Sequence, residues 1–308
     1  MSFARATVAL IMAVIATLSV VRPAPAQDSI PSLLQRTGMF HTRKIRESSG
    51  VAVSRSHPGV LWTHNDSGDG AFLYAINISG DLLGVYHVRG ARTEDWEDLA
   101  LGPCPDRSGS CLYIADIGDN SQKRKSVRMY VVPEPDPPEG SPWQDTLETA
   151  PARELVFTYP DRSHDAEALF VDPQGRANVI TKGKSGPVRR FVLPRAAFQR
   201  DSTTAILVDT LPIRPQRTLG RLVTGASISP SGRRVVVRTY SELYFFRRSA
   251  AGSLRLDGHP CWIGAVEPQG EAVAFLDEET VILTSESLGN EAGTLLQVGC
   301  ARAAEAKP

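Results

Sequence analysis

The sequence predicts an all-β protein in which five repeated units close into a β-propeller. Three observations lead to this prediction. Short apolar runs of period two alternate with turn residues, a similar strand-and-turn unit recurs about every fifty residues, and one strand near the N-terminus belongs to no unit of its own. Helical periodicity is scarce, so helical classes of fold are not favoured.

The charge balance argues against a polyanionic partner. The 308 residues contain 34 Lys and Arg and 34 Asp and Glu, so the formal net charge is zero. Proteins that bind nucleic acid or anionic membranes usually carry a basic excess, which this chain lacks. We expect no nucleic-acid partner, a small polar ligand or a peptide instead, and a monomeric chain.

The N-terminal segment has the pattern of a secretory signal peptide over residues 1–26. Arg5 precedes an apolar run from 6 to 21, and Ala24 and Ala26 supply the small residues before a cleavage site. The run is shorter than the ~20 residues of a membrane-spanning helix, and no other segment could span a membrane. We expect a secreted or periplasmic protein without membrane insertion.

Four cysteines in an exported chain predict two disulfides. Cys104 and Cys111 flank a turn-rich loop between two strands, so we expect them to pair locally. Cys261 and Cys300 would then join the late strands. Free thiols are less favoured outside the cytosol, and the absence of a CxxC spacing argues against a metal site of four cysteines.

Each repeated unit has the same internal order. Small or acidic residues lead into an apolar strand, and the next strand runs out into polar residues. The leading segments are 47–51, 96–100, 166–169, 224–228 and 271–275, and the polar ends are 62–68, 113–120, 179–183, 236–240 and 282–286. Four strands fit into each unit, as in a propeller blade.

The two ends of the chain complete the ring in this prediction. Residues 40–45 form a spare first strand, and the fifth unit has only three strands of its own, so the N-terminal strand would close the last blade and remove its exposed edge. We predict one propeller domain over 33–300 and a disordered tail at 301–308. A proline-rich insert, 133–151, leaves six blades as the alternative if it hides a degenerate blade.

Polar residues fall in two kinds of loop that open on one face of a propeller. One kind leads into the innermost strand, and the other leaves the second strand. Crowded carboxylates repel one another, so some must be protonated, paired or metal-bound, and oxygen-rich clusters suit calcium or magnesium. We predict a divalent cation, with calcium favoured, held by Glu97, Asp98, Asp116, Asp119 and Glu167.

The remaining polar residues of these loops are candidates for ligand contact and catalysis. His64 and His164 are expected to transfer protons, and Lys182 to stabilise a developing anion. The residues expected to contact a ligand are Glu47, Asn65, Asp66, Trp96, Arg238, Tyr240, Glu271 and Glu286.

A turn role is the open alternative for some of these residues. Asp and Asn are ordinary turn formers, which applies to Asp66, Asp119 and Asn120. No turn former is needed just ahead of a buried strand, where glutamates recur. We therefore expect the glutamates to face the channel: Glu47, Glu97, Glu167 and Glu271.

Several of these motifs resemble a known group of proteins. Glu-Ser-Ser-Gly at 47–50, Trp-Thr-His-Asn-Asp-Ser-Gly at 62–68, Asp-Trp-Glu-Asp at 95–98 and His-Asp-Ala-Glu at 164–167 resemble secreted bacterial propeller proteins that are largely uncharacterised. The chain is more loosely similar to the SdiA-regulated and phytase-esterase-like propeller families. The resemblance covers about residues 47–182 and implies the fold and an exported location. The calcium-assisted hydrolysis of related propellers depends on residues that do not match here one by one.

Two functions are compatible with the sequence. No HExxH motif or nucleophile elbow occurs, so a hydrolase would need a metal-activated water or a carboxylate base. Such an enzyme would act on a small polar ester, lactone or phosphoester. The alternative is a non-catalytic module that binds a sugar or peptide and holds at most a structural ion.

Overall fold

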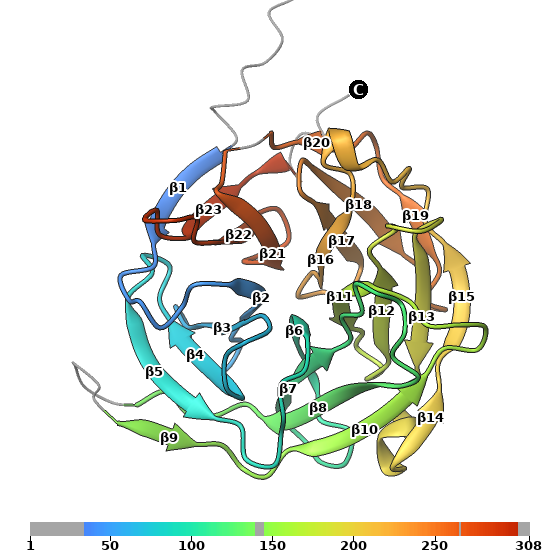
Figure 1. Ribbon diagram of the computed structural model, residues 1–308, viewed down its shortest axis with the longest axis horizontal. Helices are drawn as coiled ribbons and strands as arrows, with labels where there is room; N and C mark the ends of the chain where they lie inside the picture. The colour runs from blue at the N-terminus through green and yellow to red at the C-terminus, as the bar shows by residue number, and fades with distance from the viewer. Residues whose placement is uncertain (1–33, 139–144, 265, 301–308) are drawn as a thin grey trace, which may run out of the picture.

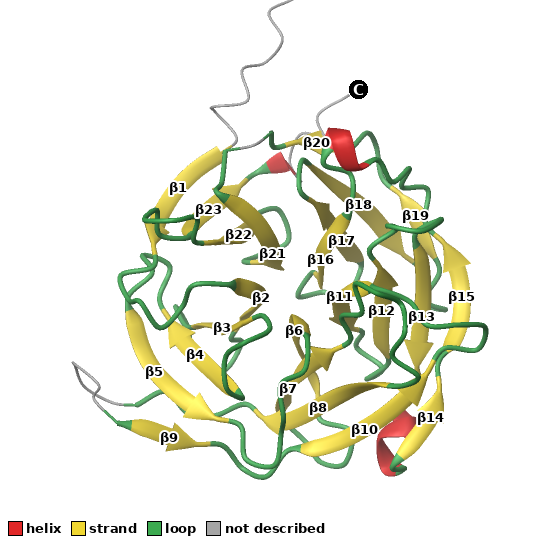
Figure 2. Cartoon of the chain, in the orientation of Figure 1, coloured by secondary structure: helices red, strands yellow, loops and turns green. Residues whose placement is uncertain are grey.

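A computed structural model describes residues 34–138, 145–264 and 266–300, and in this part of the chain five β-sheets stand around a common axis (Figure 1). The innermost strands are β2, β6, β11, β16 and β21, and each sheet extends outward from one of them. Strands make up most of the regular structure, with short 3-10 helices at Arg195–Gln199 and Arg217–Leu219 (Figure 2). The prediction of a five-bladed propeller is confirmed.

Apart from β1, β9 and β14, the strands of the five blades follow one another in chain order. Blade one has β2 (Ser48–Val53), β3 (Leu61–Asn65), β4 (Phe72–Ile76), β5 (Leu82–His87) and β9 (Thr146–Glu148). Blade two has β6 (Trp96–Pro103), β7 (Ser110–Asp116), β8 (Val127–Pro133), β10 (Arg153–Thr158) and β14 (Ser202–Thr204). Blade three has β11 (Ala166–Val171), β12 (Ala177–Thr181), β13 (Arg189–Leu193) and β15 (Ile206–Thr210). Blade four has β16 (Val223–Ile228), β17 (Arg234–Thr239), β18 (Glu242–Arg248), β19 (Leu254–Leu256) and β20 (Cys261–Trp262). Blade five has β21 (Gln269–Phe275), β22 (Val281–Glu286), β23 (Thr294–Val298) and β1 (Leu34–Met39).

An N-terminal strand closes the ring, but it lies six residues earlier than predicted. β1 runs antiparallel to β23, from Leu34 opposite Val298 to Met39 opposite Thr294. The predicted strand, 40–45, is instead a loop that leads from blade five to blade one. Its apolar residues Phe40 and Ile45 are buried in the core between these blades, so their pattern marks a buried loop and not a strand.

Two other segments contribute short strands. The described part of the proline-rich insert adds no sixth blade, and its residues 146–148 form β9, which pairs in parallel with β5 of blade one. In blade four, β19 and β20 both pair with β18, at opposite ends of that strand. In both places short strands cover outer sheet edges, as natural β proteins commonly arrange.

The core is divided among the interfaces between adjacent blades. Five buried hydrophobic clusters occur in the described chain, and each combines side chains from two neighbouring blades. Between blades one and two, for example, Trp62 packs edge-on against Tyr86, and the fully buried Trp96 joins the same cluster. Because each blade buries both faces against its neighbours, the stability of one blade depends on the whole ring.

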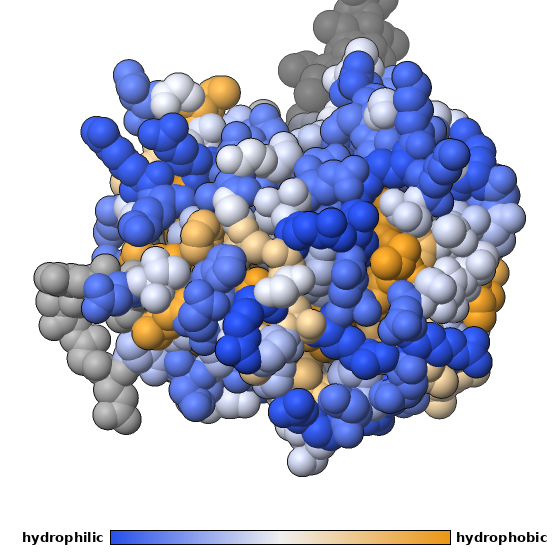
Figure 3. Space-filling view, turned by 60° about the horizontal axis from the view of Figure 1, so that its bottom comes forward, coloured by the Kyte–Doolittle hydropathy of each residue, from blue (hydrophilic) through white to orange (hydrophobic). Residues whose placement is uncertain are grey.

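Both predicted disulfides are present. Cys104–Cys111 closes the loop between β6 and β7, and Cys261–Cys300 joins the blade-four segment to the end of blade five, with Cα separations of 4.9 and 6.1 Å. The described residues contain no helix that is long and apolar enough to cross a bilayer. Hydrophilic residues cover most of the face seen in Figure 3, with smaller hydrophobic patches between them. The predicted signal peptide, 1–26, and tail, 301–308, lie outside the described residues.

The closing strand lies against a turn of blade one at a position where only glycine fits. A Cβ on Gly38 would lie 2.1 Å from the carbonyl oxygen of Ser79, which belongs to the turn between β4 and β5. The backbones therefore meet directly where the first and last blades join.

Replacing this glycine tests the closure. We expect Gly38→Ala to lower the free energy of unfolding by about 1–3 kcal/mol, because the added methyl group overlaps backbone and not a movable side chain. Urea denaturation measures the change. Gly299→Ala is the matched control, since a Cβ there would meet no heavy atom within 4 Å, and its stability should stay within about 0.5 kcal/mol of wild type. Equal effects of the two substitutions would contradict the proposed contact.

Candidate functional site

Each of the five innermost strands carries a β-bulge at the same place. In every blade the register against the second strand slips by one residue, so one extra residue stands on the inner strand. Bulges re-aim side chains and often occur beside functional sites. The extra residues are Ser49, Glu97, Glu167, Thr224 and Glu271, and all are buried.

The bulge residues divide into hydroxyls and carboxylates. Ser49 donates a hydrogen bond from Oγ to the backbone carbonyl of Glu97 at 2.7 Å, and Thr224 does the same to that of Glu271 at 2.8 Å. The hydroxyl-bearing bulges thus tie adjacent blades together. Glu47, expected to be equivalent to the other glutamates, lies two residues before the bulge and is exposed, so Ser49 takes its place in the repeat.

The second strands end beside these bulges. Asp66, Lys182 and Tyr240 directly follow β3, β12 and β17, and Glu286 is the last residue of β22. Their charges act on one another and on the bulge glutamates. We call this set of residues the mouth: Asp66, Asp95, Glu97, Asp165, Glu167, Lys182, Tyr240, Glu271 and Glu286.

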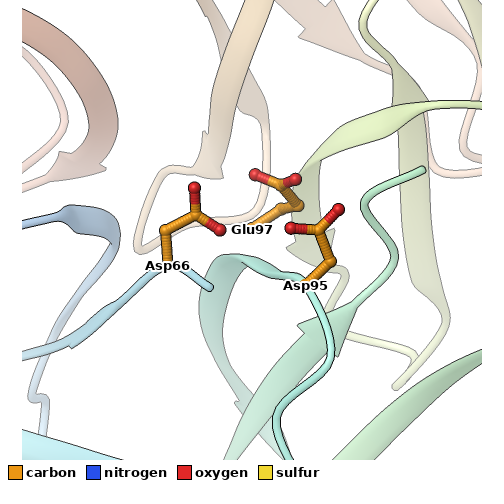
Figure 4. Close-up of side chains that lie close together, drawn as sticks. All are labelled: Asp66, Asp95 and Glu97. Atoms are coloured by element: carbon orange, nitrogen blue, oxygen red, sulfur yellow. The ribbon is translucent and has the colours of Figure 1, made fainter. Parts of the chain in front are cut away.

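Five carboxylates of the mouth form two overlapping groups. Ligand atoms of Asp66, Asp95 and Glu97 lie within 4.8 Å of one another, and those of Glu97, Asp165 and Glu167 meet the same limit. The first three side chains point toward one another, Asp66 and Asp95 from loops and Glu97 from strand β6 (Figure 4). Spacing of this kind and a purely oxygen donor set suit a hard divalent cation such as calcium.

Some of these oxygens have no protein partner. No hydrogen bond or ion pair reaches the carboxylate of Glu97 within the described part of the chain, although the residue is only 3% exposed. Asp165 is equally buried; its Oδ1 accepts the backbone N–H of Asp119 at 3.1 Å, and its Oδ2 has no partner. Buried carboxylates without donors are costly, so a bound cation would stabilise them.

A glycine makes room for the first group. A Cβ on Gly118 would lie 2.1 Å from Oε1 of Glu97 and 2.4 Å from Oδ2 of Asp95. The loop that leaves β7 can therefore approach these carboxylates only because residue 118 has no side chain.

Lys182 is the cation in contact with the second group. Its Nζ lies 2.6 Å from Oε1 of Glu167, and the two side chains are 13% and 4% exposed. Burial opposes the charge of Lys182, but Glu167 and its acidic neighbours together raise the pKa of this lysine above its usual value. The ammonium therefore stays charged at neutral pH and offsets part of the negative charge.

Burial and mutual repulsion raise the pKa of the other mouth carboxyls. Burial and then the charge of Asp66 raise the pKa of Asp95 to about 6 and that of Glu286 to about 7. Burial, followed by Glu286, raises the pKa of Glu271 to about 7, and burial is also the largest cause of the raised pKa of Glu97. Ionising these groups in the folded protein therefore costs free energy that a cation would lower.

Three of the five predicted metal ligands are not brought into these groups. Asp98 is fully buried and accepts backbone N–H groups from Leu169 at 2.7 Å and Ala226 at 3.1 Å. Asp116 bonds to Arg124 at 2.7 Å, and Asp119 accepts the N–H groups that cap its own loop. These carboxylates hold the channel wall and the loop, and Glu97 and Glu167 alone of the predicted ligands stand in the groups.

Both predicted histidines are buried, and their rings contact protein groups. His64 packs edge-on against Trp96 with ring centroids 5.5 Å apart, and burial lowers the pKa of His64 to about 4, so it is neutral at pH 7. His164 contacts Asp161 at 2.9 Å and packs against Tyr159. Trp96 is fully buried in the core and offers no face to a ligand.

Two residues that were predicted to contact a ligand, Arg238 and Asn65, stabilise the fold instead. Arg238 is fully buried, donates to the carbonyls of Ala272 and Thr284, and pairs with Glu267, so it joins blade four to blade five. Asn65 uses its side chain to accept the N–H groups of residues 46 and 47. Asp66, Tyr240, Glu271 and Glu286 do stand at the mouth.

Asp95 and Asp165 are site residues that the sequence prediction missed. Each lies two residues before a bulge glutamate, in Asp95-Trp96-Glu97 and Asp165-Ala166-Glu167. This repeated Asp-x-Glu spacing was the available signal. This spacing alone does not identify a site, because every regular strand places residues i and i+2 on the same face.

Solved structures that are similar to this chain share little of its sequence. No family model and no curated protein sequence matches it. The PQQ-bound aldose sugar dehydrogenase of Streptomyces coelicolor is 12% identical, with a TM-score of 0.48 over 87% of this chain and 97% of that chain. A streptogramin B lyase is 9% identical, with a TM-score of 0.41 over 86% and 97%. The Dos1 propeller is 13% identical, with a TM-score of 0.37 over 78% of this chain and 52% of that chain. We draw no conclusion about activity from similarities at this level.

Substituting Asp98 separates a structural role from a metal-binding one. We expect Asp98→Ala to lower the free energy of unfolding by about 2–4 kcal/mol in metal-free buffer, because buried N–H groups of two neighbouring blades lose their acceptor. Asp201→Ala, at an exposed aspartate, is the control and should change stability by less than about 0.5 kcal/mol. Wild-type stability of Asp98→Ala by urea denaturation would contradict this role.

The raised pKa of Glu271 predicts that the stability of the protein depends on pH. Its pKa is raised to about 7 in the fold, so its stabilising contribution is present at low pH and is lost as the pH rises through 7. In metal-free buffer we expect Glu271→Gln to stabilise the protein by about 3 kcal/mol at pH 8 and by less than about 1 kcal/mol at pH 5. Urea denaturation at both pH values provides the measurement.

Glu278→Gln is the control for this experiment. Ser231 holds the pKa of Glu278 below its usual value in spite of burial, so this substitution should not stabilise the protein at pH 8. If Glu271→Gln stabilised the protein equally at both pH values, the ionisation of Glu271 would not be what destabilises the folded state.

Proposed function

We propose that this protein is an exported, divalent-metal-dependent hydrolase of a small polar ester, lactone or phosphoester. The observation that carries the proposal is the pair of carboxylate groups at the mouth, in which the carboxylate of the buried Glu97 and Oδ2 of Asp165 have no hydrogen-bond donor among the described residues. Unpaired buried carboxylates fit a cation better than they fit a neutral sugar or peptide.

The donor set fits calcium or another oxygen-preferring ion. Asp66, Asp95 and Glu97 would hold it, with Asp165 and Glu167 adjacent. Such an ion would polarise the scissile group and lower the pKa of a bound water. The two disulfides support an oxidising compartment, which agrees with export to the periplasm or the medium.

Among the described residues, we assign the role of the base to Glu271. Its Oε1 accepts a hydrogen bond from Gln269 at 3.0 Å, its Oε2 has no partner, and its pKa of about 7 suits proton transfer near neutral pH. This role replaces the one predicted for His64 and His164, which are buried among protein groups. Lys182 would stabilise the anion that develops on the substrate.

The reaction would use water and no other co-reactant. The water oxygen forms a bond to the carbonyl carbon or phosphorus while its proton passes to Oε2 of Glu271. The ester C–O or P–O bond breaks, and the leaving oxygen takes up a proton. Tyr240 and Glu286 would contact polar groups of the substrate at the mouth.

Turnover measurements test the proposal. Protein stripped of metal and then loaded with Ca²⁺ is assayed on chromogenic esters, lactones and phosphoesters, with and without EDTA. We expect turnover that EDTA abolishes and that Glu271→Gln lowers in kcat by about 10²–10⁴-fold. Glu278→Gln, on a remote loop, is the matched control.

The binding-module alternative is the other outcome of this experiment. If metal-loaded protein turns over nothing on the whole panel, the hydrolase proposal fails. A sugar or peptide that binds at the mouth without reaction, measured by calorimetry, would then identify the protein as a binding module.

A further inference from the structure

The two carboxylate groups of the mouth define two adjacent cation positions that share Glu97. One position is bounded by Asp66, Asp95 and Glu97, and the other by Glu97, Asp165 and Glu167. The proposed function requires a cation at the mouth but does not state how many ions bind or where. The contacts of the two groups differ, and this difference decides the question.

Among the described residues, no basic side chain forms an ion pair with the three carboxylates of the first position. Figure 4 shows the three carboxylates turned toward one another. Arg124, whose charge acts on Asp95, donates its hydrogen bonds to Asp116, Glu94 and the carbonyl of Gly118. Lys182, whose charge acts on Asp66 and Glu97, is paired with Glu167. Glu97 is 3% exposed and unpartnered in the described chain, so a buried carboxylate is aimed into a space that no protein donor fills.

The second position already contains a positive charge. Nζ of Lys182 lies 2.6 Å from Oε1 of Glu167, which is close to the distance at which a calcium ion would bind the same oxygen. A divalent ion placed there would lie against the ammonium, which is held by its own buried ion pair. Repulsion at such short range disfavours simultaneous occupation.

We propose that the mouth binds one divalent ion, at Asp66, Asp95 and Glu97, and that the ammonium of Lys182 replaces a second ion between Glu97, Asp165 and Glu167. This inference rests on the proposed metal dependence of the site. It assigns Lys182 a second role, since the residue limits the number of ions in addition to facing the substrate. Oδ2 of Asp165, which has no partner, remains as a donor for a second ion once the lysine is removed.

Calcium titration of metal-stripped protein, without substrate, tests the inference. Isothermal calorimetry and metal analysis after dialysis should give one Ca²⁺ per chain for wild type and two for Lys182→Met. A wild-type stoichiometry of two, or an unchanged stoichiometry in a folded Lys182→Met, would overturn it. Circular dichroism establishes that the variant is folded.

Single carboxylate substitutions in the wild-type background provide a second test that keeps Lys182 in place. We expect Asp66→Asn to weaken Ca²⁺ binding at least 10-fold, and Glu167→Gln to change it less than threefold. Asp69→Asn is the matched control, because this aspartate lies in the same loop but bonds to Asn65 and Tyr74 and not to the group. Loss of binding in Glu167→Gln with retention in Asp66→Asn would place the ion at the second position and overturn the proposal.

The outcome is separable from that of the hydrolase proposal. One calcium bound by wild type, with the expected response of Asp66→Asn, supports the ion assignment even if no ester is turned over. Turnover without any calcium bound would overturn the ion assignment and leave a carboxylate-based hydrolase.

Discussion

Closure of the ring is the constraint on which the rest of the structure depends. β1 comes from the N-terminal side and pairs with β23 from the C-terminal side, so blade five is built from both ends of the described chain. The close contact between Gly38 and Ser79 then joins that blade to blade one. Only in a closed ring do Asp66 and Glu286, which are far apart in sequence, act on one another at the mouth.

The repeated β-bulge brings the carboxylates of the candidate site together on the ring. A regular inner strand would direct its side chains alternately into the two flanking interfaces, and the extra residue breaks this alternation at one level in all five blades. Where the extra residue is Ser49 or Thr224, the hydroxyl bonds to the next blade. Where it is a glutamate, the same position places a buried carboxylate beside others, and the resulting repulsion favours a cation.

Several polar residues near the mouth stabilise the scaffold. Asp98 stands where other blades have Gly50, Ala168, Gly225 or Ala272, and its carboxylate crosses to the strands of the next two blades. Arg238 bridges blades four and five. Both carboxylate oxygens of Asp98 accept backbone N–H groups, which makes its burial tolerable and separates it from Glu97.

The sequence by itself determined the all-β class, the five units, the local disulfide and the clustering of acidic loops on one face. These features follow from period-two patterns, turn residues and spacing, which act over short stretches of chain.

The exact strand at the N-terminus was decided by tertiary structure, because Phe40 and Ile45 are buried equally well in a loop. Tertiary structure also decided which acidic side chains lie close together. A one-residue slip in each inner strand makes Glu97, Glu167 and Glu271 equivalent to Ser49 and not to Glu47, and directs Asp98 into a backbone network. No local sequence pattern predicts this one-residue register shift, because the shift depends on how each inner strand pairs with its neighbour and how the blades pack around the axis.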